Sequence, residues 1–189
     1  MYISILLLIV FSDYDYDVKK EANLPEIISQ LSKRMTGEVK KLKVDPEDII
    51  NDALAFYKSP GFDPECPIRV YFSNQPAIDT GGVRRQFYSN LFTTIIESES
   101  LKLFESPLNN LMFAYNQQAL NTGIVKFLGK MVAHSILQNG PGFPYLSLAH
   151  YYYISTDDIG KSTAYASIAD VRDLGLLEFI NKVGRIRLV

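Results

Sequence analysis

Cysteine is nearly absent from this 189-residue chain, which contains only Cys66. A lone cysteine cannot form a disulfide within the chain, and this favours a reducing, intracellular location in the cytoplasm or nucleus. Histidine is almost as scarce, because only His134 and His150 occur, on different segments. Such a small and scattered set of thiolate and imidazole ligands does not suit a tetrahedral zinc site, so no metal site is expected.

The chain also lacks an excess of charge of either sign. Its 19 lysines and arginines are balanced by 21 aspartates and glutamates, which gives a net charge of −2. No long run of basic residues interrupts this balance. Broad electrostatic binding to nucleic acid or to an anionic membrane is therefore not expected.

Long apolar runs are missing apart from YISILLLIVF at residues 2–11. A helix of that length is too short to cross a bilayer, which takes about 20 residues. No basic segment precedes the run and the acidic SDYDYD follows it, which argues against a secretory signal. We interpret residues 1–22 as an apolar and acidic segment of unclear role, either a buried strand or a start upstream of the domain, followed by a solvated linker.

Apolar residues make up 47% of the chain and aromatic residues 12%, which is enough for a core. Their spacing predicts helices over residues 82–97 and 123–138, each with a buried apolar face. Alternation in IRVYF, residues 68–72, predicts a strand, and LFES and LMFAY at 103–106 and 111–115 predict two short paired strands. The expected fold class is α+β, mostly helical, with a few short strands.

Capping residues suggest where three further helices begin. Asn23 is expected to start a helical lead-in that Gly37 ends, so that residues 23–44 precede the main domain at 45–189. Asp45, with proline next and acids after it, is expected to cap the following helix. Asp170 is expected to cap a last helix that includes Val171, Leu174, Leu177 and Phe179.

The least ordinary stretch is RVYFSNQPAIDTGGVRRQFY, residues 69–88. A dinucleotide loop needs Gly-x-Gly-x-x-Gly and a phosphate loop needs a lysine after its last glycine, and DTGGVRRQ matches neither pattern. No nucleotide or other cofactor is therefore expected. The stretch instead has the pattern of a strand, a turn and the start of a helix.

The residues of this turn predict a structural joint. Asp79 or Thr80 is placed to cap the helix, while Gly81 and Gly82 allow a sharp turn. Arg84 and Arg85 oppose the helix dipole, so at least one is expected to reach a carboxylate or carbonyl outside its own helix. A ligand site would instead leave both arginines in an open cleft.

The two residue types most often used in catalysis are interpreted as structural here. His134 lies on a helix whose other residues form an apolar face, and it is expected to be a hydrogen-bonded packing residue. Cys66 lies on a loop between Glu65 and Pro67, without the helix N-terminus or cationic neighbour that an activated thiolate needs. No catalytic residue is therefore expected within this chain.

Three motifs in order resemble the early part of a HECT-type ubiquitin ligase domain. DPEDIINDAL, at 45–54, is similar to the opening helix of that domain. CPIRVYFSNQPAIDTGGVRRQFYSNLF, at 66–92, resembles its strand, acidic Gly-Gly turn and Arg-rich helix. FLGKMVAHSILQNGPGFPYLS, at 127–147, resembles its Phe-x-Gly-Lys helix, with Gly129, and the following Gly-Pro-Gly turn, with Gly140. The resemblance covers residues 45–155 and weakens after about residue 160.

This resemblance implies a ligase that accepts ubiquitin from a conjugating enzyme as a cysteine thioester and passes it to a substrate lysine. The family's larger N-terminal lobe binds the conjugating enzyme through an inserted subdomain, and its smaller C-terminal lobe carries the cysteine. The chain is expected to hold part of the first lobe and to end before the second. Two alternatives stay open: a catalytically inactive HECT-like interaction module, and an α+β interaction module outside the family.

Overall fold

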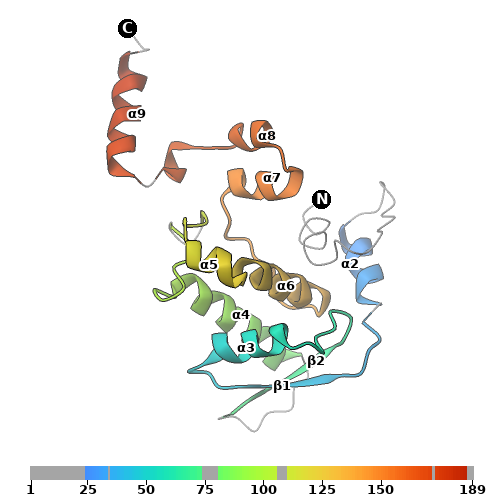
Figure 1. The fold of residues 1–189 in the computed structure, drawn as a ribbon. Helices are drawn as coiled ribbons and strands as arrows, with labels where there is room; N and C mark the ends of the chain where they lie inside the picture. The colour runs from blue at the N-terminus through green and yellow to red at the C-terminus, as the bar shows by residue number, and fades with distance from the viewer. Residues whose placement is uncertain (1–23, 34, 74–80, 106–109, 172, 187–189) are drawn as a thin grey trace. The chain divides into compact units, whose positions relative to one another are not determined.

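The computed structural model describes most of the chain as an α+β fold dominated by helices (Figure 1). The described residues are 24–33, 35–73, 81–105, 110–171 and 173–186. They divide into two compact units, one formed by residues up to 101 with 116–143, the other by 102–115 with residues from 144 onward. The predicted α+β class is confirmed. The expected division of the chain at residues 22 and 44 stays a prediction.

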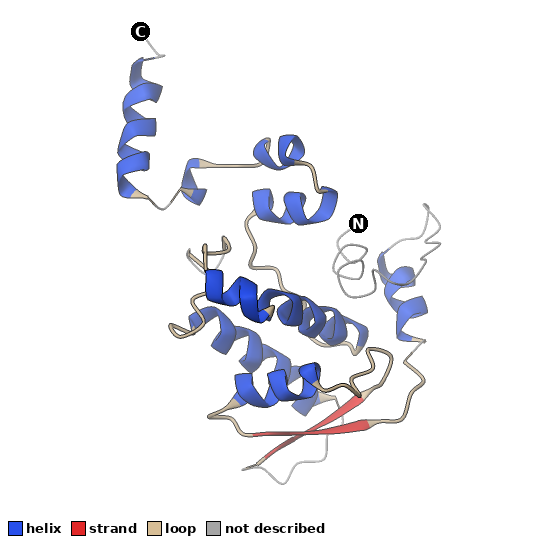
Figure 2. Ribbon diagram, viewed as in Figure 1, coloured by secondary structure: helices blue, strands red, loops and turns tan. Residues whose placement is uncertain are grey.

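The first unit is built on two parallel strands joined by a helix. Strand β1 (Lys40–Val44) pairs with β2 (Ile68–Phe72), and α3 (Ile49–Lys58) connects them. Leu42 lies opposite Val70 in the register. Along both strands alternate side chains are buried, so one face of the sheet belongs to the core, on the side where the helices lie (Figure 2).

Two long helices supply most of the remaining core of this unit. They are α4 (Gly82–Glu97) and α6 (Ile124–Leu137), which match the helices predicted over 82–97 and 123–138. Each has a buried apolar face, as the spacing predicted. The buried residues of α4 are Phe87, Tyr88, Leu91, Phe92 and Ile95, and the apolar ones of α6 are Ile124, Leu128, Met131, Val132, Ala133 and Leu137.

Two shorter helices are also described in the first unit. Helix α2 (Leu24–Ser32) packs Ile27 and Leu31 against Leu137 at the end of α6, and α5 (Gln117–Thr122) leads into α6. The predicted lead-in helix is thus present, but it ends at Ser32, before Gly37. Its expected cap, Asn23, lies outside the described residues.

The expected start of α3 at Asp45 is wrong by about one turn. Helix α3 begins at Ile49, after Asp48. The Asp45 side chain accepts a hydrogen bond from the Glu47 amide at 3.0 Å, and its own amide donates to Asp52 at 2.7 Å. Asp45 and Pro46 therefore form a turn before the helix, because a short acidic side chain competes for nearby backbone amides.

In the described residues of the second unit there are four helical segments and isolated bridges, without a sheet. The helices are α7 (Leu148–Thr156), α8 (Ile159–Thr163), the 3₁₀ turn η1 (Ile168–Asp170) and α9 (Leu174–Ile186). A bridge between Phe104 and Phe113 confirms that the segments predicted to pair do so, although over a single residue pair.

Asp170 does not cap the last helix as predicted. Asp170 is instead the last residue of η1. Its carboxylate accepts hydrogen bonds from the Ser167 amide at 2.7 Å and from the Asn110 side chain at 2.6 Å. Helix α9 starts at Leu174, and Val171 lies before it. Within the ranges that the structure describes, no helix is long and apolar enough to cross a membrane.

Candidate functional site

The start of α4 contains the glycine pair singled out in the sequence. Gly81 immediately precedes the helix and has φ +102°, in the left-handed region that side chains rarely adopt. Gly82 is the first helical residue, and a Cβ atom there would meet nothing within 4 Å. Only Gly81 is therefore required by the backbone. Asp79 and Thr80, the expected caps, lie outside the described residues.

Both arginines of the motif reach carbonyls outside α4, as predicted. Arg84 donates from Nη1 to the Ile68 carbonyl at 3.2 Å, and Arg85 donates from Nε to the Asn139 carbonyl at 2.8 Å. Asn139 follows the C-terminus of α6, where backbone carbonyls carry partial negative charge. These contacts offset the unfavourable interaction of the two cations with the positive end of the α4 dipole. They also connect that end of the helix to β2 and to the end of α6.

Gly140 lies at this same junction. Helix α6 ends at Leu137, and the residue after it in the left-handed region is Asn139, with φ +57°. A Cβ atom at Gly140 would lie 2.4 Å from Oγ of Ser135 and 3.1 Å from the ring of Tyr88. Glycine is needed because the backbone passes too close to its neighbours for a side chain. Gly129 lies half-buried inside α6.

A buried histidine lies at the centre of the first unit. His134 is 2% exposed, and its Nδ1 atom is 2.9 Å from the Tyr57 hydroxyl and 3.4 Å from the Tyr88 hydroxyl. Its Nε2 atom is 3.0 Å from the Cys66 carbonyl. A carbonyl can only accept, so it favours the tautomer with the proton on Nε2, and Nδ1 then accepts from Tyr57.

Gln138 packs against the ring. Its side-chain nitrogen is 2.8 Å from Nε2 of His134, one helical turn earlier, but both atoms are donors in this tautomer and so do not hydrogen-bond to each other. Its oxygen accepts a hydrogen bond from the amide of Ile68, the first residue of β2, at 2.8 Å. Hydrogen bonds thus link the imidazole to α3, α4 and the loop that carries Cys66, and Gln138 links the end of α6 to β2.

Burial sets the protonation of this network. It lowers the pKa of His134 to about 4, and it raises the pKa values of the Tyr57 and Tyr88 hydroxyls above their usual range. All three groups are therefore neutral near pH 7. Because their side chains are buried, they cannot reach a substrate, and the arrangement stabilises the fold rather than transferring protons. The prediction of His134 as a satisfied packing residue is confirmed.

The single cysteine is also buried. Its Sγ atom donates to the Asp63 carboxylate at 3.2 Å, and burial together with that carboxylate raises the thiol pKa. The conditions that activate a thiolate are a cationic neighbour and access to solvent. Cys66 lacks access to solvent, because a Cβ atom on Gly37 would lie 2.6 Å from Sγ and the backbone covers the sulfur closely. The charge of Lys40 lowers the thiol pKa, but burial and Asp63 raise it by more.

His150 belongs to the second unit and is only half-buried. It lies on α7, where its Nδ1 atom is 3.4 Å from the hydroxyl of Ser147, the capping residue of that helix. Burial lowers its pKa. In the portion of the chain that is described, no group of three or more His, Cys, Asp or Glu side chains is arranged to hold a metal ion.

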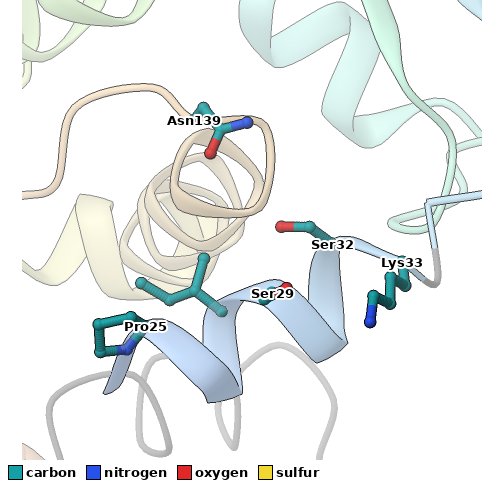
Figure 3. Close-up of a pocket in the computed structure, with 6 residues that line it drawn as sticks. Pro25, Ser29, Ser32, Lys33 and Asn139 are labelled. Carbon is teal, nitrogen blue, oxygen red and sulfur yellow. The ribbon is translucent and has the colours of Figure 1, made fainter. Parts of the chain in front are cut away.

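A shallow hollow of about 580 Å³ separates α2 from the turn after α6 (Figure 3). Its lining is formed by Pro25, Ile28, Ser29, Ser32, Lys33 and Asn139. The Ser32 hydroxyl donates to the Leu137 carbonyl at 3.0 Å and so already has a structural role. Few polar groups that point into the hollow are left for a ligand. We therefore interpret the hollow as a gap in the packing between α2 and the end of α6, and not as a binding site.

Sequence reasoning missed Tyr57 and Gln138 as members of the buried network. Tyr57 lies on the buried face of α3, and a tyrosine on such a face needs a partner for its hydroxyl. Gln138 stands four residues after His134 near a helix end, which is the one local signal that could have linked them. The contacts with Cys66 and Tyr88 span 68 and 46 residues and have no local signal.

Comparison with known proteins identifies distant relatives. No protein-family model matches the chain. It is 27% identical over 169 residues to the G2/M phase-specific E3 ubiquitin-protein ligase of Gallus gallus, and 23% identical over 168 residues to the protein of that name in Homo sapiens. These alignments cover 87% of this chain but only 22% and 23% of the relatives, so the chain spans less than a quarter of their length. They support a distant relationship to E3 ubiquitin-protein ligases.

Proposed function

We propose that this chain is part of the N-terminal lobe of a HECT-type ubiquitin-protein ligase. One contact carries the proposal: Arg85 of the Asp-Thr-Gly-Gly-Val-Arg-Arg motif donates to the carbonyl of Asn139, next to Gly140 of the Asn-Gly-Pro-Gly motif. Two segments that resemble the family separately in sequence therefore meet in the fold. The distant E3 relatives support the same assignment.

In this proposal the complete ligase performs two successive acyl transfers. A cysteine thiolate attacks the thioester carbonyl between the conjugating enzyme and ubiquitin, and the thiolate of the conjugating enzyme leaves. A substrate lysine amine then attacks the new thioester, so that an isopeptide bond forms and the ligase cysteine is released as thiolate. Cysteine suits this role because its thiolate is a good nucleophile and its thioester stays reactive toward amines.

The role proposed for this chain is to hold and position, not to carry the thioester. The junction of β2, α4 and α6 is buried and closely packed, which suits a rigid scaffold. Cys66 is buried beneath Gly37 and has a raised pKa, so it does not serve as the acceptor. The proposed partners are a ubiquitin-conjugating enzyme and ubiquitin, in the cytoplasm or nucleus, with a substrate protein that remains to be identified.

A second candidate function is a catalytically inactive HECT-like interaction module. The state of Cys66 favours it, because this thiol is buried and its pKa is raised. Such a module would bind the partners of a full ligase without forming a thioester.

One experiment separates the two. The transcript is sequenced downstream of the codon for Val189, and the full-length product is incubated with activating enzyme, conjugating enzyme, ubiquitin and ATP. A ubiquitin adduct that thiol reductants remove, and that is lost when a downstream cysteine becomes serine, is the expected result. A full-length product that binds the conjugating enzyme yet forms no adduct would favour the interaction module.

A further inference from the structure

The face of the sheet opposite the core is basic. Lys41, Lys43 and Arg69 are exposed there, and Tyr71 is half-buried. The register places Lys41 opposite Arg69 and Lys43 opposite Tyr71. Paired residues on neighbouring strands lie about 5 Å apart at Cα, so two cations are direct neighbours and a third lies two residues along β1.

Within the described residues these cations are not neutralised. Among the described residues, no carboxylate forms an ion pair with Lys41, Lys43 or Arg69; the ion pair found there, between Lys161 and Asp158, lies in the second unit. Like charges directly opposite each other destabilise a sheet. The concentration of cations is also local, because the whole chain has a net charge of −2. A basic face with an unfavourable charge arrangement calls for an anionic partner.

The outer edge of β1 presents backbone groups at the same two lysines. The amide of Lys40 donates to Pro67, and the carbonyl of Val44 accepts from Ser73, so residues 40, 42 and 44 direct their backbone groups toward β2. Successive residues of a strand alternate, so Lys41 and Lys43 direct theirs outward. In the described part of the sheet, which has two strands, no third strand pairs with this edge.

The lysines determine what can add to this edge. Charged residues on an edge strand prevent pairing with another copy of the same strand, because lysine would then meet lysine. They admit a strand of opposite charge, whose carboxylates would lie on the basic face beside the ammonium groups. Leu42 and Val44, which point to the core side, would have apolar residues as neighbours.

We propose that the outer edge of β1 binds an extended acidic segment of a partner protein, in which carboxylates alternate with apolar residues. The segment adds as a third strand, hydrogen-bonded to Lys41 and Lys43, with its carboxylates paired to these lysines and near Arg69. Main-chain hydrogen bonds supply affinity in this mode of recognition, and alternate side chains supply specificity. This surface is independent of the proposed ligase chemistry.

The test uses the full chain and a fluorescent peptide that alternates Glu and Val, with fluorescence anisotropy as the readout. The double variant Lys41→Glu/Lys43→Glu should bind the peptide about tenfold more weakly, equivalent to about 1.4 kcal/mol. The matched control, Lys126→Glu/Lys182→Glu, makes the same change of charge at two other exposed lysines and should bind within about twofold of the original. Equal losses in both variants would overturn the proposal.

Two N-methylated peptides test strand addition on the unmodified protein. A methyl group on the Glu amides blocks an antiparallel strand, whereas one on the Val amides blocks a parallel strand. Loss of binding with one peptide and retention with the other supports the proposal and gives the direction of the added strand. Retention with both would show attraction between charges without strand pairing, and would overturn it.

The chain itself contains alternating acids at Asp13, Asp15 and Asp17. The variant that changes all three to asparagine should bind the Glu-Val peptide as the original chain does. If only that variant binds the peptide, the edge is taken by the chain's own segment, and the proposal of a partner protein is overturned.

Discussion

His134 makes the stability of the first unit depend on pH, because the folded chain binds its proton more weakly than the unfolded chain does. Burial lowers the pKa from an ordinary 6.5 to about 4. Between these two pH values His134 binds a proton in the unfolded chain but not in the folded chain, so the free energy of unfolding decreases as the pH falls. The stabilisation is fully present above pH 6.5 and is lost progressively toward pH 4.

We expect this loss to reach about 3 kcal/mol between pH 7 and pH 4. Urea unfolding at several pH values in this interval measures it. Replacing His134 with Gln should lower stability at pH 7 and flatten the dependence on pH, whereas His150→Gln should leave the slope nearly unchanged because His150 is only half-buried. Parallel pH profiles for the original chain and His134→Gln would contradict this account.

Gly81 and Gly82, at the start of α4, should respond differently to substitution by alanine. Gly81→Ala places a side chain at φ +102° and should destabilise the chain by about 1 to 2 kcal/mol. Gly82→Ala lies in open space on the first helical residue and should be neutral or stabilising by up to about 1 kcal/mol. Thermal and urea unfolding measure the stability of the two variants. Equal destabilisation would show that the conformation of the turn does not depend on Gly81.

Helix α4 is anchored at its first turn by the two arginines, which join it to β2 and to the end of α6. Because the Arg84 contact is partly buried and the Arg85 contact is exposed, their losses should differ. This junction, rather than any single side chain, keeps the two family-like motifs together.

Arg84→Met should lower the free energy of unfolding by about 1.5 to 3 kcal/mol, as expected for a lost hydrogen bond from a charged group. Arg85→Met should cost about 1 kcal/mol or less, because water screens and replaces the exposed contact. Lys126→Met serves as the surface control in the same urea titrations. If all three variants unfold at the same urea concentration, the arginine contacts do not stabilise the junction.

The elements that sequence predicted well are those with strong local periodicity, and α4, α6 and β2 are the examples. Strand β1 was missed because KKLKV has few apolar residues and becomes a strand only by pairing with β2, 28 residues later at Leu42 and Val70. Helix α7 was missed because LAHYYYI lacks a polar face. The arginine contacts followed from the helix dipole, whereas the crowding at Gly140 comes from Ser135, nearby in the chain, and from Tyr88, far away in sequence.

The whole chain should not accept ubiquitin by itself. Incubated with activating enzyme, conjugating enzyme, ubiquitin and ATP, it should form no adduct that a thiol reductant removes, because its single thiol is buried with a raised pKa. Non-reducing gel electrophoresis detects such an adduct. A reducible adduct that disappears in Cys66→Ser would show that Cys66 becomes accessible and that the proposed scaffold role is incomplete.

The contact between Tyr57 and His134 joins two segments that are synthesised at different times. Tyr57 and His134 are separated by 77 residues, and ribosomes add roughly 5 to 20 residues per second. Tyr57 on α3 therefore leaves the ribosome roughly 4 to 15 seconds before His134. A parallel pair of strands cannot close as a hairpin in the meantime. During that interval the apolar side of the nascent sheet lacks α6, the helix that supplies His134 and much of its core.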